Sequence, residues 1–512
     1  MTILKHVPAP YIAYQSQEDY LNWIEQNADT TDVSVGIAPT AAGKSLQNVT
    51  AGRYFVAEQN MSVALMAPRK ILQDQYTGSF GWLPTLKGMG AYICTDCMMN
   101  PGTSCRTRKN NIGKCCGEEC PYIQARGAAA SAKLALFNFH SYFVNKMFKD
   151  VAIIDEGHGA IDLLYGLFGK KLWKCEVGYA DDVELTPAGI SDVIKDLISG
   201  LEMRLEMLVK NRMDDKMIES LQDEIDSFVM VRQALEDCGE DFLIKKKKDL
   251  YFGNMKELKK TEQEYIYVKT LKIDKLAERV LWPRDQVKKI MLTSATISKE
   301  DIELLGLSDR RVKFYECPSN IPWEQRMFVI DPVANMSYKH RAESLPIIAK
   351  KIVDIAAQHK DQKGIVHATY EVARQLKLLL GERGRFMYHD NRDKDEVLAQ
   401  FMASKGNKIL VASGMSEGID LKDDYARFQI LTGLVFPSLA DDVMAWMALH
   451  FPNRYRWMAI RDLIQRTGRI VRHPADYGVT YFIGAELDKR FFYATEWMWP
   501  KWFKDAMVWL KE

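Results

Sequence analysis

The sequence predicts an α/β protein with two parallel-sheet domains, and three observations carry this prediction. The first 160 residues alternate between apolar, β-rich runs and helical stretches, which is typical of parallel sheets with crossover helices. A second alternation of this kind begins near Met327. Between the two, from about residue 190 to residue 241, apolar residues recur at helical spacing instead. A chain of 512 residues is long enough for about two to four domains, so it can hold two sheets and a helical insertion.

The strands of the first domain are short apolar runs that end in polar residues. "VSVGI" (Val33–Ile37) is expected to be a buried strand, and "APTAAGKS" and a helix follow it. "SVALMAP" is expected to be the next strand and "RKILQDQY" the next helix. "KLALFNFH", "VAIIDEGH" and, after the helical insertion, "KKIMLTSATI" complete the sheet. Ligands of such sheets bind at the carboxyl ends of the strands, so the chemistry is expected at these polar ends.

The helical insertion is expected to be a pair of antiparallel amphipathic helices. Their apolar residues are Val193, Leu197, Leu201, Leu205 and Leu208 in the first helix, and Ile218, Leu221, Ile225, Phe228 and Val229 in the second. The run "KKKK" (Lys245–Lys248) that follows is interpreted as a solvated loop.

The second domain shows four clear strands: "GIVHA", "NKILVAS", "FQILTGLVF" and "VTYFIG". The tryptophan-rich stretch "FFYATEWMWPKWFKDAMVWL" is expected to be a terminal helix packed into a core. No internal repeat is visible in the sequence, so the second alternation is not a recognisable copy of the first.

The composition is that of an ordinary globular protein, with 47% hydrophobic and 27% charged residues. The net charge of +1 argues against a broad basic surface, although a nucleic-acid enzyme can concentrate its charge in one groove. No apolar run reaches the roughly 18 residues of a membrane span, and "MTILKHVPAP" has no apolar secretory core. The expected location is therefore the cytoplasm, where thiols are metal ligands or free more often than disulfides.

The stretch "APTAAGKS" (Ala38–Ser45) lies between a strand and a helix, where backbone N–H groups and the helix dipole can hold a phosphate. In such a loop Lys44 reaches the β- and γ-phosphates and Ser45 binds Mg²⁺. The stretch departs from the G-x-x-x-x-G-K-[ST] pattern, because Ala38 stands where the first glycine is expected. The other residues expected to line the phosphates are Ala38, Thr40, Ala41, Ala42 and Gly43.

Two adjacent carboxylates, Asp155 and Glu156, end a later strand of the same sheet in "IIDEGH". Asp155 is expected to hold Mg²⁺, and Glu156 to position or deprotonate the attacking water. A lone Asp-Glu pair is often only a solvated acidic turn. That alternative is weakened here because a phosphate loop precedes the pair in the same sheet.

Two arginines of the second domain, Arg469 and Arg472, are candidates for contact with a γ-phosphate. They lie in "QRTGRIVR" (Gln465–Arg472), and their spacing of three would put both on one side of a helix. Arginines from a second domain stabilise the charge that spreads in phosphoryl transfer. An arginine pair by itself is usually a surface ion-pair former, so the interpretation depends on the phosphate loop.

The order of these motifs resembles that of superfamily 2 helicases, and specifically the XPD/DinG family of iron–sulfur DNA helicases. "APTAAGKS" resembles motif I, although family members often have Gly where Ala41 stands, and "MAPRKILQDQY", "IIDEGH", "LTSATI" and "GIVHATY" resemble motifs Ia, II, III and IV. "SEGIDL" resembles motif V, with Ser416 in place of the usual Trp, and its Gly418 and Asp420 are implied to contact the nucleotide. "QRTGRIVRHPADYG" resembles motif VI, which implies roles for Gln465 and both arginines, and "LDKRF" fits the family's D-x-R. Gln17 resembles the family's adenine-contacting Gln, and Gln15 competes with it.

Six of the nine cysteines lie between Cys94 and Cys120, where the family has a four-cysteine [4Fe–4S] domain. The family's block opens on an aromatic-x-Cys element and closes on Cys-Pro-Tyr, as "YIC" and "CPY" do here. The ligands implied by the resemblance are Cys94, Cys105, Cys116 and Cys120, with Cys97 and Cys115 as possible substitutes. Thiolates also bind zinc, and Cys94 and Cys97 have zinc-ribbon spacing, so zinc stays an alternative. The isolated Cys175, Cys238 and Cys317 are expected to be small buried hydrophobic residues.

Basic residues within this block could neutralise backbone phosphates: Arg106, Arg108, Lys109 and Lys114. Tyr92 and Tyr122 flank the block and could stack on bases or pack against the shell of the cluster. The lysine run described above has an alternative role along the exit path of a nucleic-acid strand.

The resemblance implies two RecA-like α/β domains with parallel sheets, with an iron–sulfur domain and a helical arch domain inserted in the first. The expected division assigns residues 1–90, 126–163 and 265–325 to the first RecA-like domain, 91–125 to the cluster, 164–264 to the arch and 326–512 to the second RecA-like domain. The implied activity is that of a monomeric ATP-dependent DNA helicase, with ATP and Mg²⁺ in the cleft between the domains. It would move 5′ to 3′ on single-stranded DNA and open DNA with 5′ tails, in the cytoplasm or in a host's cytoplasm if viral. Two alternatives stay open: a superfamily 2 translocase or RNA helicase, and a non-catalytic strand-binding module switched by nucleotide.

Overall fold

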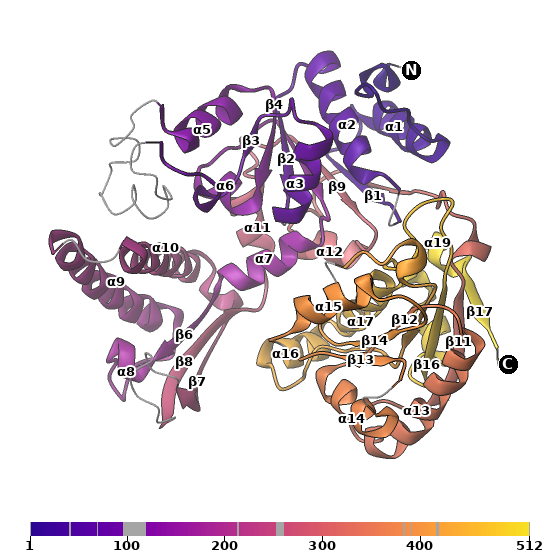
Figure 1. Ribbon diagram of the computed structural model, residues 1–512. Helices are drawn as coiled ribbons and strands as arrows, with labels where there is room; N and C mark the ends of the chain where they lie inside the picture. The colour runs from indigo at the N-terminus through magenta and orange to yellow at the C-terminus, as the bar shows by residue number, and fades with distance from the viewer. Residues whose placement is uncertain are drawn as a thin grey trace. The chain divides into compact units, whose positions relative to one another are not determined.

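The computed structural model describes residues 2–39, 42–68, 70–95, 119–211, 215–251, 261–381, 384–390, 392–415 and 419–510 (Figure 1). The chain forms two compact units. The first comprises Met1–Ala13, Leu21–Gly36 and Ser45–Phe314, and the second comprises Tyr14–Tyr20, Ile37–Lys44 and Tyr315–Glu512. In the expected phosphate loop, the residues up to Lys44 therefore belong to the second unit, and Ser45 belongs to the first unit.

The first sheet has seven strands in the described part of the chain, in the order β10-β1-β9-β5-β2-β4-β3. Its central strand β5 (Val151–Asp155) is buried at all five residues, as a parallel strand covered on both faces is. Its neighbours β2 and β9 both pair with it in parallel. The remaining strands are β1 (Val33–Ile37), β2 (Val63–Ala67), β3 (Thr85–Leu86), β4 (Leu134–Asn138), β9 (Lys289–Ser294) and β10 (Val312–Glu316). The strands predicted for this sheet are confirmed.

The helices that connect these strands begin at residues suited to a helix start. Asn138 caps α6 by accepting a hydrogen bond from the Ser141 N–H, and Ser298 and Asp301 form a reciprocal capping box at α12. Pro121 occupies the first turn of α5, where its missing N–H costs nothing. The helices are α1 (Gln15–Asn27), α2 (Lys44–Glu58), α3 (Lys70–Ser79), α5 (Pro121–Ser131), α6 (Phe139–Val144), α7 (Gly159–Leu167), α11 (Asp274–Leu281) and α12 (Lys299–Leu304).

The predicted pair of long helices is confirmed as α9 (Pro187–Lys210) and α10 (Asp215–Cys238). In α9 the fully buried stripe is Ile190, Ile194, Ile198 and Leu205, while the other residues predicted for this face are half-buried beside it. In α10 the predicted stripe is buried except for Val229, which is 48% exposed. A short helix, α8 (Lys174–Val177), and a three-stranded antiparallel sheet accompany the pair (Figure 1).

This small sheet, in the order β6-β8-β7, corrects the interpretation of the lysine run. Its strands are β6 (Gly169–Trp173), β7 (Phe242–Tyr251) and β8 (Thr261–Thr270). Lys245–Lys248 lie in the middle of β7 and are not in a loop, because the backbone of β7 pairs with β8 from Phe242 to Tyr251. Ladder pairing outweighs the low strand preference of lysine, whose long side chain can reach water from either face.

The second unit has a seven-stranded sheet, in the order β13-β14-β12-β15-β16-β11-β17, whose recorded pairs are all parallel. Val366 of the inner strand β12 faces one hydrophobic cluster and Ile365 faces the other, so this strand is covered on both sides. The strands are β11 (Phe328–Ala334), β12 (Gly364–His367), β13 (Phe386–Tyr388), β14 (Ile409–Ala412), β15 (Phe428–Leu431), β16 (Val479–Gly484) and β17 (Met507–Trp509), and the main helices are α13 (Arg341–Gln358), α14 (Tyr370–Leu380), α15 (Lys394–Ala403), α16 (Asp442–His450) and α17 (Pro452–Thr467).

The tryptophan-rich end is not the single terminal helix that was expected. It forms α18 (Lys489–Thr495), a 3₁₀ turn (Glu496–Met498), α19 (Lys501–Lys504) and the edge strand β17. Pro500 cannot continue a helix through this stretch, and β17 gains backbone partners by pairing with β11. The expected packing is confirmed for Trp499, Trp502 and Phe503, which are buried.

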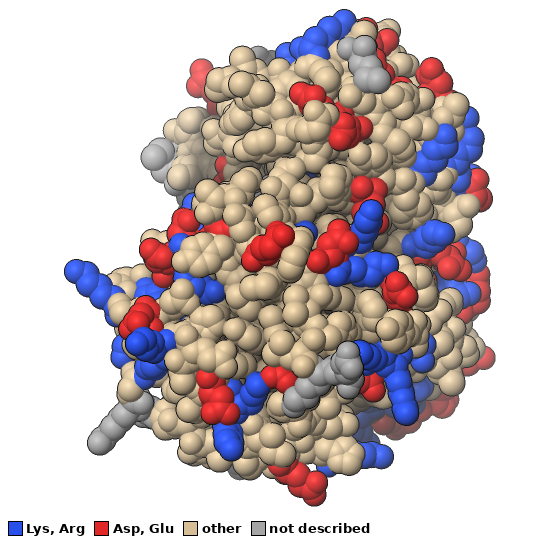
Figure 2. All heavy atoms as spheres, turned by 90° about the vertical axis from the view of Figure 1, so that its right-hand side faces the viewer, with Lys and Arg blue, Asp and Glu red and all other residues tan. Residues whose placement is uncertain are grey.

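The charged side chains on the face shown in Figure 2 are intermixed. Among the described residues on this face, lysines and arginines lie beside acidic side chains and large uncharged areas. This agrees with the near-zero net charge of the sequence. None of the helices that the structure describes is long and apolar enough to cross a membrane.

Candidate nucleotide site

Gln17 of α1 is hydrogen-bonded to the expected phosphate loop. Its amide N–H group donates to the carbonyl oxygen of Ala42 (2.9 Å), and its Oε1 accepts from the N–H of Tyr14 (2.9 Å). Gly43 has a φ of +70°, and a Cβ at this position would clash with Gln17 Nε2, so the loop requires glycine here. The competing Gln15 instead bonds another side chain of its own helix. Of the two candidates, Gln17 is therefore the one in contact with the loop.

Tyr76 of α3 links the start of α2 to the end of β5. Its hydroxyl donates to Asp155 Oδ2 (2.9 Å), accepts from Asn48 Nδ2 (3.0 Å) and is also hydrogen-bonded to the Ser45 side chain. Burial, and then the neighbouring Asp155 charge, raises the pKa of Tyr76 well above its usual value, so the hydroxyl keeps its proton. Ser45 and Asp155, the two residues predicted to bind Mg²⁺, thus meet at one buried hydroxyl.

Glu156 lies beside this group and is held by the end of β9. The Ser294 hydroxyl donates to Glu156 Oε2 (3.3 Å) and lies 2.8 Å from His158 Nδ1. Because its only proton goes to Glu156, the hydroxyl accepts from the Nδ1–H of His158. Glu156 has a φ of +50°, a conformation that costs a non-glycine residue of this kind about 1–3 kcal/mol. Such strain at a carboxylate next to Asp155 is typical of a functional position.

These contacts explain how the three sequence motifs form one site in the first unit. Through Tyr76, Ser45 at the start of α2 meets Asp155 at the end of β5, and Ser294 at the end of β9 holds Glu156. A hydroxyl and a carboxylate oxygen are ligands that Mg²⁺ prefers, so Ser45 and Asp155 fit the ion that the motifs imply. The sequence did not single out Tyr76, Asn48, His158 or Ser294, although all but Asn48 lie inside quoted motifs.

In the second unit the two candidate arginines do not share a helix, which corrects the prediction. Helix α17 carries Gln465 and ends at Thr467, so Arg469 and Arg472 lie in the loop beyond it. The helix cannot continue, because the carbonyl of Arg469 accepts from the N–H of Leu421 and the N–H of Arg472 donates to Asp476. These bonds to other segments replace the i to i−4 ladder of a helix.

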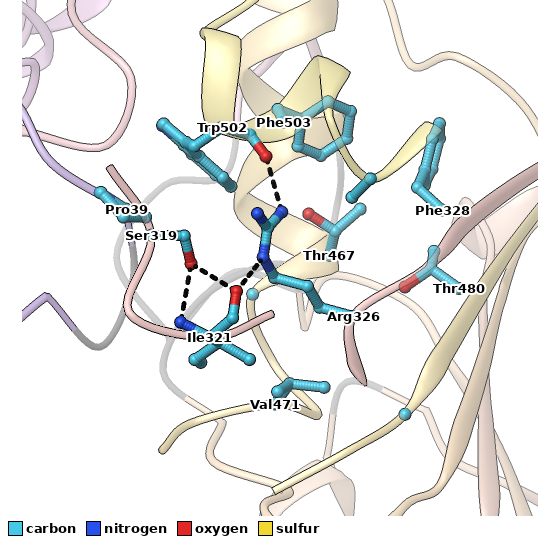
Figure 3. Close-up of a pocket in the computed structure, with 13 residues that line it drawn as sticks. Pro39, Ser319, Ile321, Arg326, Phe328, Thr467, Val471, Thr480, Trp502 and Phe503 are labelled. Carbon is cyan, nitrogen blue, oxygen red and sulfur yellow. Dashed lines mark hydrogen bonds between the residues drawn. The ribbon is translucent and has the colours of Figure 1, made fainter. Parts of the chain in front are cut away.

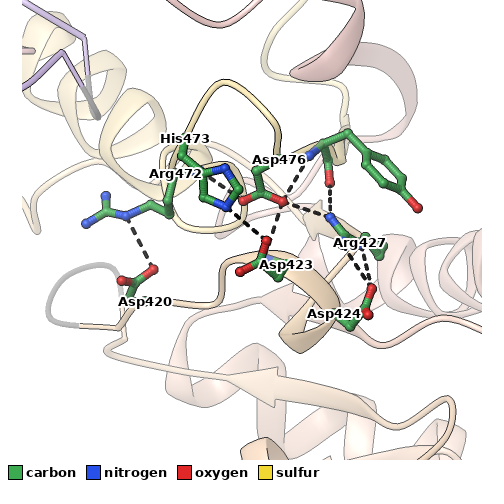
Figure 4. A network of polar contacts seen from close by, with 8 residues as sticks. Asp420, Asp423, Asp424, Arg427, Arg472, His473 and Asp476 are labelled. Carbon is green, nitrogen blue, oxygen red and sulfur yellow. Dashed lines mark hydrogen bonds and ion pairs between the residues drawn. The ribbon is translucent and has the colours of Figure 1, made fainter.

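Arg472 is paired with Asp420, the candidate carboxylate of motif V (Figure 4). Its Nε lies 3.3 Å from Asp420 Oδ1, and a second nitrogen donates to the carbonyl of Gly468 (3.1 Å). The motif V carboxylate and the motif VI arginine are therefore brought together by the fold of the second unit. Gly418 of motif V, two residues before Asp420, lies outside the described residues.

Asp476 is the buried anchor of this loop (Figure 4). Its Oδ1 accepts from the Arg427 guanidinium (2.7 Å) and from the N–H groups of Tyr477 and Asp423, and its Oδ2 accepts from the N–H of Arg472. Asp423, His473 and Asp476 have ligand atoms within 4.8 Å of one another, which is close enough for a metal ion. The four N–H donors on Asp476 already satisfy it, so this group is a structural anchor of motif VI.

His367 connects motif IV to the end of α17. Its Nε2 lies 3.2 Å from Gln429 Oε1 on β15, and Gln429 Nε2 donates to the carbonyl of Thr467 (3.0 Å). Burial, and then the charge of Arg466, lowers the pKa of His367 to about 3, so the imidazole is neutral. This chain of contacts ends one residue before Gly468, where the loop of the two arginines begins.

A small pocket of about 40 Å³ lies on the other side of that loop (Figure 3). Thr467, Gly468 and Val471 line it, and Pro39 of the phosphate loop also borders it. Arg326 extends into the pocket and donates to the carbonyl oxygens of Ile321 (2.9 Å) and Trp502 (2.6 Å). The pocket is far smaller than the roughly 300 Å³ of a typical ligand site, so it is a packing gap rather than a nucleotide site.

Two of the predicted cluster ligands, Cys94 and Cys120, are described and fully buried. The rings of Tyr92 and Tyr122 that flank them are in contact, with centroids 5.6 Å apart, so the two ends of the cysteine block lie together. Buried thiols fit a soft metal group. Tyr122 is only 4% exposed, so for this residue the packing alternative is correct and base stacking is wrong. Cys238 and Cys317 are buried as predicted, but Cys175 is exposed.

Several predicted site residues lie outside the described part of the chain. They are Thr40 and Ala41 of the phosphate loop, Gly418 of motif V, the cysteines Cys97, Cys105, Cys115 and Cys116, and the basic residues Arg106, Arg108, Lys109 and Lys114.

Comparison with known proteins gives one family match and a consistent structural match. Residues 352–506 match the helicase C-terminal domain family, and no curated protein matches the sequence. A structure titled XPD helicase superposes with a TM-score of 0.63 at 14% identity, over 98% of this chain and 100% of that chain. S. tokodaii Xpd4 gives 0.56 at 12% identity over 97% and 100%, and an apo XPD structure gives 0.55 at 15% over 95% and 99%. The chain therefore has the fold of these XPD structures, with two seven-stranded parallel sheets, and residues 352–506 of its second unit match a helicase C-terminal domain.

Proposed function

We propose that this chain, with its XPD-like fold and helicase C-terminal domain, is an ATP-dependent DNA helicase. It moves 5′ to 3′ along single-stranded DNA and opens duplexes that carry a 5′ tail. The ordered set of motifs from "APTAAGKS" to "QRTGRIVRHPADYG" supports this proposal over nearly the whole sequence. It acts as a monomer in the cytoplasm of its cell or host.

The observation that carries the proposal is the meeting of Ser45 and Asp155 at the Tyr76 hydroxyl, with Glu156 beside them. A bound Mg²⁺ would neutralise charge on the β- and γ-phosphates. Lys44 binds the same phosphates, and Glu156 orients a water and accepts its proton as the water oxygen attacks the γ-phosphorus. The bond from the γ-phosphorus to the bridging oxygen breaks, and ADP leaves.

The residues of the second unit act on the same reaction in this proposal. Arg469 and Arg472 stabilise the negative charge on the transferring phosphoryl group, and Gln465 contacts the nucleotide. In the structure the Nε of Arg472 is paired with Asp420, so a residue of motif V holds the arginine that is proposed to contact a phosphate. Exchange of this ion pair would link nucleotide state to the conformation of motifs V and VI.

The proposed helicase function also gives roles to the cysteine block and to the helical insertion. We propose that Cys94, Cys105, Cys116 and Cys120 hold a [4Fe–4S] cluster within residues 91–125, and that residues 164–264 form the arch. The burial of Cys94 and Cys120, and the contact between the tyrosines that flank them, supports a bound group between the two ends. These four thiolates would hold the cluster, which would cross-link this part of the chain.

ATP hydrolysis by the purified protein, with and without single-stranded DNA, tests the first step. Lys44→Ala and Glu156→Gln are each expected to lower the DNA-stimulated rate by about 100-fold or more. Lys405→Ala, at an exposed position of the second unit, is the matched control and should leave the rate unchanged. Intact stimulated hydrolysis in the Lys44→Ala variant would overturn the proposed site.

Unwinding of tailed duplexes separates the remaining alternatives. We expect strand separation with a 5′ DNA tail, and none with a 3′ tail or an RNA tail. Unwinding only from RNA tails would indicate an RNA helicase, and hydrolysis without unwinding would indicate a translocase. Nucleotide-dependent strand binding without any hydrolysis would indicate a binding module.

A further inference from the structure

The open face of the small antiparallel sheet alternates lysines with aromatic rings. The register pairs Lys171 of β6 and Lys245 of β7 with Tyr267 of β8, and it pairs Trp173 and Lys247 with Tyr265. Because side chains alternate between the two faces of a strand, all these residues lie on one face. Gly169, Leu243, Lys269 and Asp249 share it. The face thus carries four lysines and one carboxylate among its described residues.

The opposite face of the same sheet is a packing face. Leu172, Ile266 and Val268 are fully buried there, and Lys170 lies 5.0 Å from the ring centre of Phe228 on α10. Lys246 donates to the carbonyl of Asp181, in the segment that follows α8. The helix α10 and this segment therefore cover one side of the sheet, and the lysine-aromatic face is the other side.

On the open face the ammonium groups of Lys171 and Lys247 lie over aromatic rings, and that of Lys171 also pairs with Asp249 (3.3 Å). Lys171 Nζ is 4.7 Å from the ring centre of Tyr265 and 5.5 Å from that of Trp173, and Lys247 Nζ is 5.0 Å from that of Tyr267. The rings of Trp173 and Tyr265 are in contact, with centroids 4.6 Å apart. Lys171 and Lys245 are exposed, and Trp173, Tyr267 and Lys247 are half-buried. Positive groups and ring faces are thus presented together, at a spacing of roughly 7 Å along each strand.

We propose that this face binds single-stranded nucleic acid, with the lysines on the phosphates and Tyr267 and Trp173 stacked on bases. Unpaired bases expose faces that stack on aromatic side chains, and lysines neutralise the backbone between them. A duplex buries its base faces, so rings that stand on a sheet surface select a single strand. The inference rests on the proposed function, which supplies the strand, and it adds a surface that no helicase motif contributes to.

The lysine run itself provides a matched test, because its neighbouring residues point to opposite faces. Lys245→Ala/Lys247→Ala removes two charges from the open face, and Lys246→Ala/Lys248→Ala removes two from the other face of β7. Binding of oligo-dT and of oligo-rU is measured by fluorescence anisotropy over a range of salt concentrations. Each lost phosphate contact lowers the slope of log K against log salt by about 0.7 for a single strand. We expect the slope of the first variant to be shallower by about 1.4 than that of the wild type. When the salt concentration falls from 1 M to 0.1 M, the affinity of the wild type should therefore rise about 25-fold more than the affinity of this variant.

Replacement of the ring tests stacking separately from charge. Tyr267→Ala is expected to weaken binding by about 5- to 150-fold at every salt concentration, whereas Tyr267→Phe keeps the stacking surface and the affinity. Thermal unfolding confirms that each variant is folded. The dT and rU probes show whether the face prefers DNA or RNA, and a blunt duplex should not compete.

The outcomes separate this inference from the proposed function. Equal losses in the two lysine variants, or no loss in either, would overturn the inference while strand-stimulated ATP hydrolysis by the wild-type protein still supported a helicase. Failure of the wild-type protein to bind any single strand would overturn both. Loss confined to Lys245→Ala/Lys247→Ala, with a reduced salt slope, supports the inference.

Discussion

At the residue scale, a single hydroxyl organises the candidate magnesium site. Tyr76 is fully buried and touches Asp155, Asn48 and Ser45 through its oxygen. A buried carboxylate that lost this donor would lose a hydrogen bond that offsets its desolvation. Tyr76 is therefore expected to hold Ser45 and Asp155 in place before the ion binds.

The change Tyr76→Phe is expected to lower the free energy of unfolding by about 1–3 kcal/mol, because it removes a hydrogen-bond donor from a buried carboxylate. Tyr142→Phe is the matched control: Tyr142 is also fully buried, and its hydroxyl has no hydrogen-bond partner among the described residues. That control should change stability by less than about 0.5 kcal/mol. Urea denaturation without Mg²⁺ measures both, and equal effects in the two variants would count against the proposed role of the Tyr76 hydroxyl.

At the element scale, neutral His367 joins strands β12 and β15 and, through Gln429, the end of α17. Burial first, and then nearby arginines, lowers the pKa of this imidazole to about 3, against about 6.5 in an unfolded chain. Between pH 6.5 and pH 3 the unfolded state therefore binds a proton that the folded state does not. Stability contributed by this group is complete above pH 6.5 and is lost as the pH falls.

Below pH 6, His367 is accordingly expected to lower the free energy of unfolding of the wild-type protein by up to about 1.4 kcal/mol for each pH unit. His367→Gln keeps a donor for Gln429 but cannot titrate, so its decline between pH 6 and pH 4.5 should be shallower by that amount. His340→Gln, at an exposed position, should follow the wild type. Denaturant midpoints across this pH range provide the measurement. Parallel curves for wild type and His367→Gln would show that the imidazole titrates normally in the fold.

At the scale of the whole molecule, the proposed iron–sulfur assignment depends on the cysteine block between Cys94 and Cys120. Two of its six cysteines, Cys94 and Cys120, are buried side chains at the two ends of the block. Their burial does not choose between iron and zinc, since both bind thiolates. Only the metal content of the protein makes that choice.

Protein purified without oxygen is expected to contain about four iron and four sulfide per chain and to absorb broadly near ~400 nm. Cys94→Ser and Cys120→Ser should each lose this iron. Cys175→Ser, at an exposed cysteine away from the block, should retain it. Zinc in place of iron would contradict the cluster assignment and reopen the questions of polarity and DNA preference, while leaving the two-sheet motor intact.

The sequence predicted the sheets well because their strands are continuous apolar runs. β1, β5 and β9 appear where "VSVGI", "VAIIDEGH" and "KKIMLTSATI" placed them, and the polar residues at their ends form the candidate site. The prediction from the sequence was wrong where pairing between distant segments decides the local structure. Lys245–Lys248 form a strand because β7 pairs with β8. The tryptophan-rich end is not one helix because Pro500 interrupts it and its last residues pair with β11.

By itself the sequence determined the α/β class, the order of the motifs and the residue types of the nucleotide site, because these depend on periodicity and on side-chain chemistry within short segments. Only the tertiary structure decided that Tyr76 joins Ser45 to Asp155, that Ser294 and His158 hold Glu156, and that Asp476 fixes the arginine loop. The reason is physical: a buried polar group must find a partner, and that partner is set by which strands and helices the fold brings side by side.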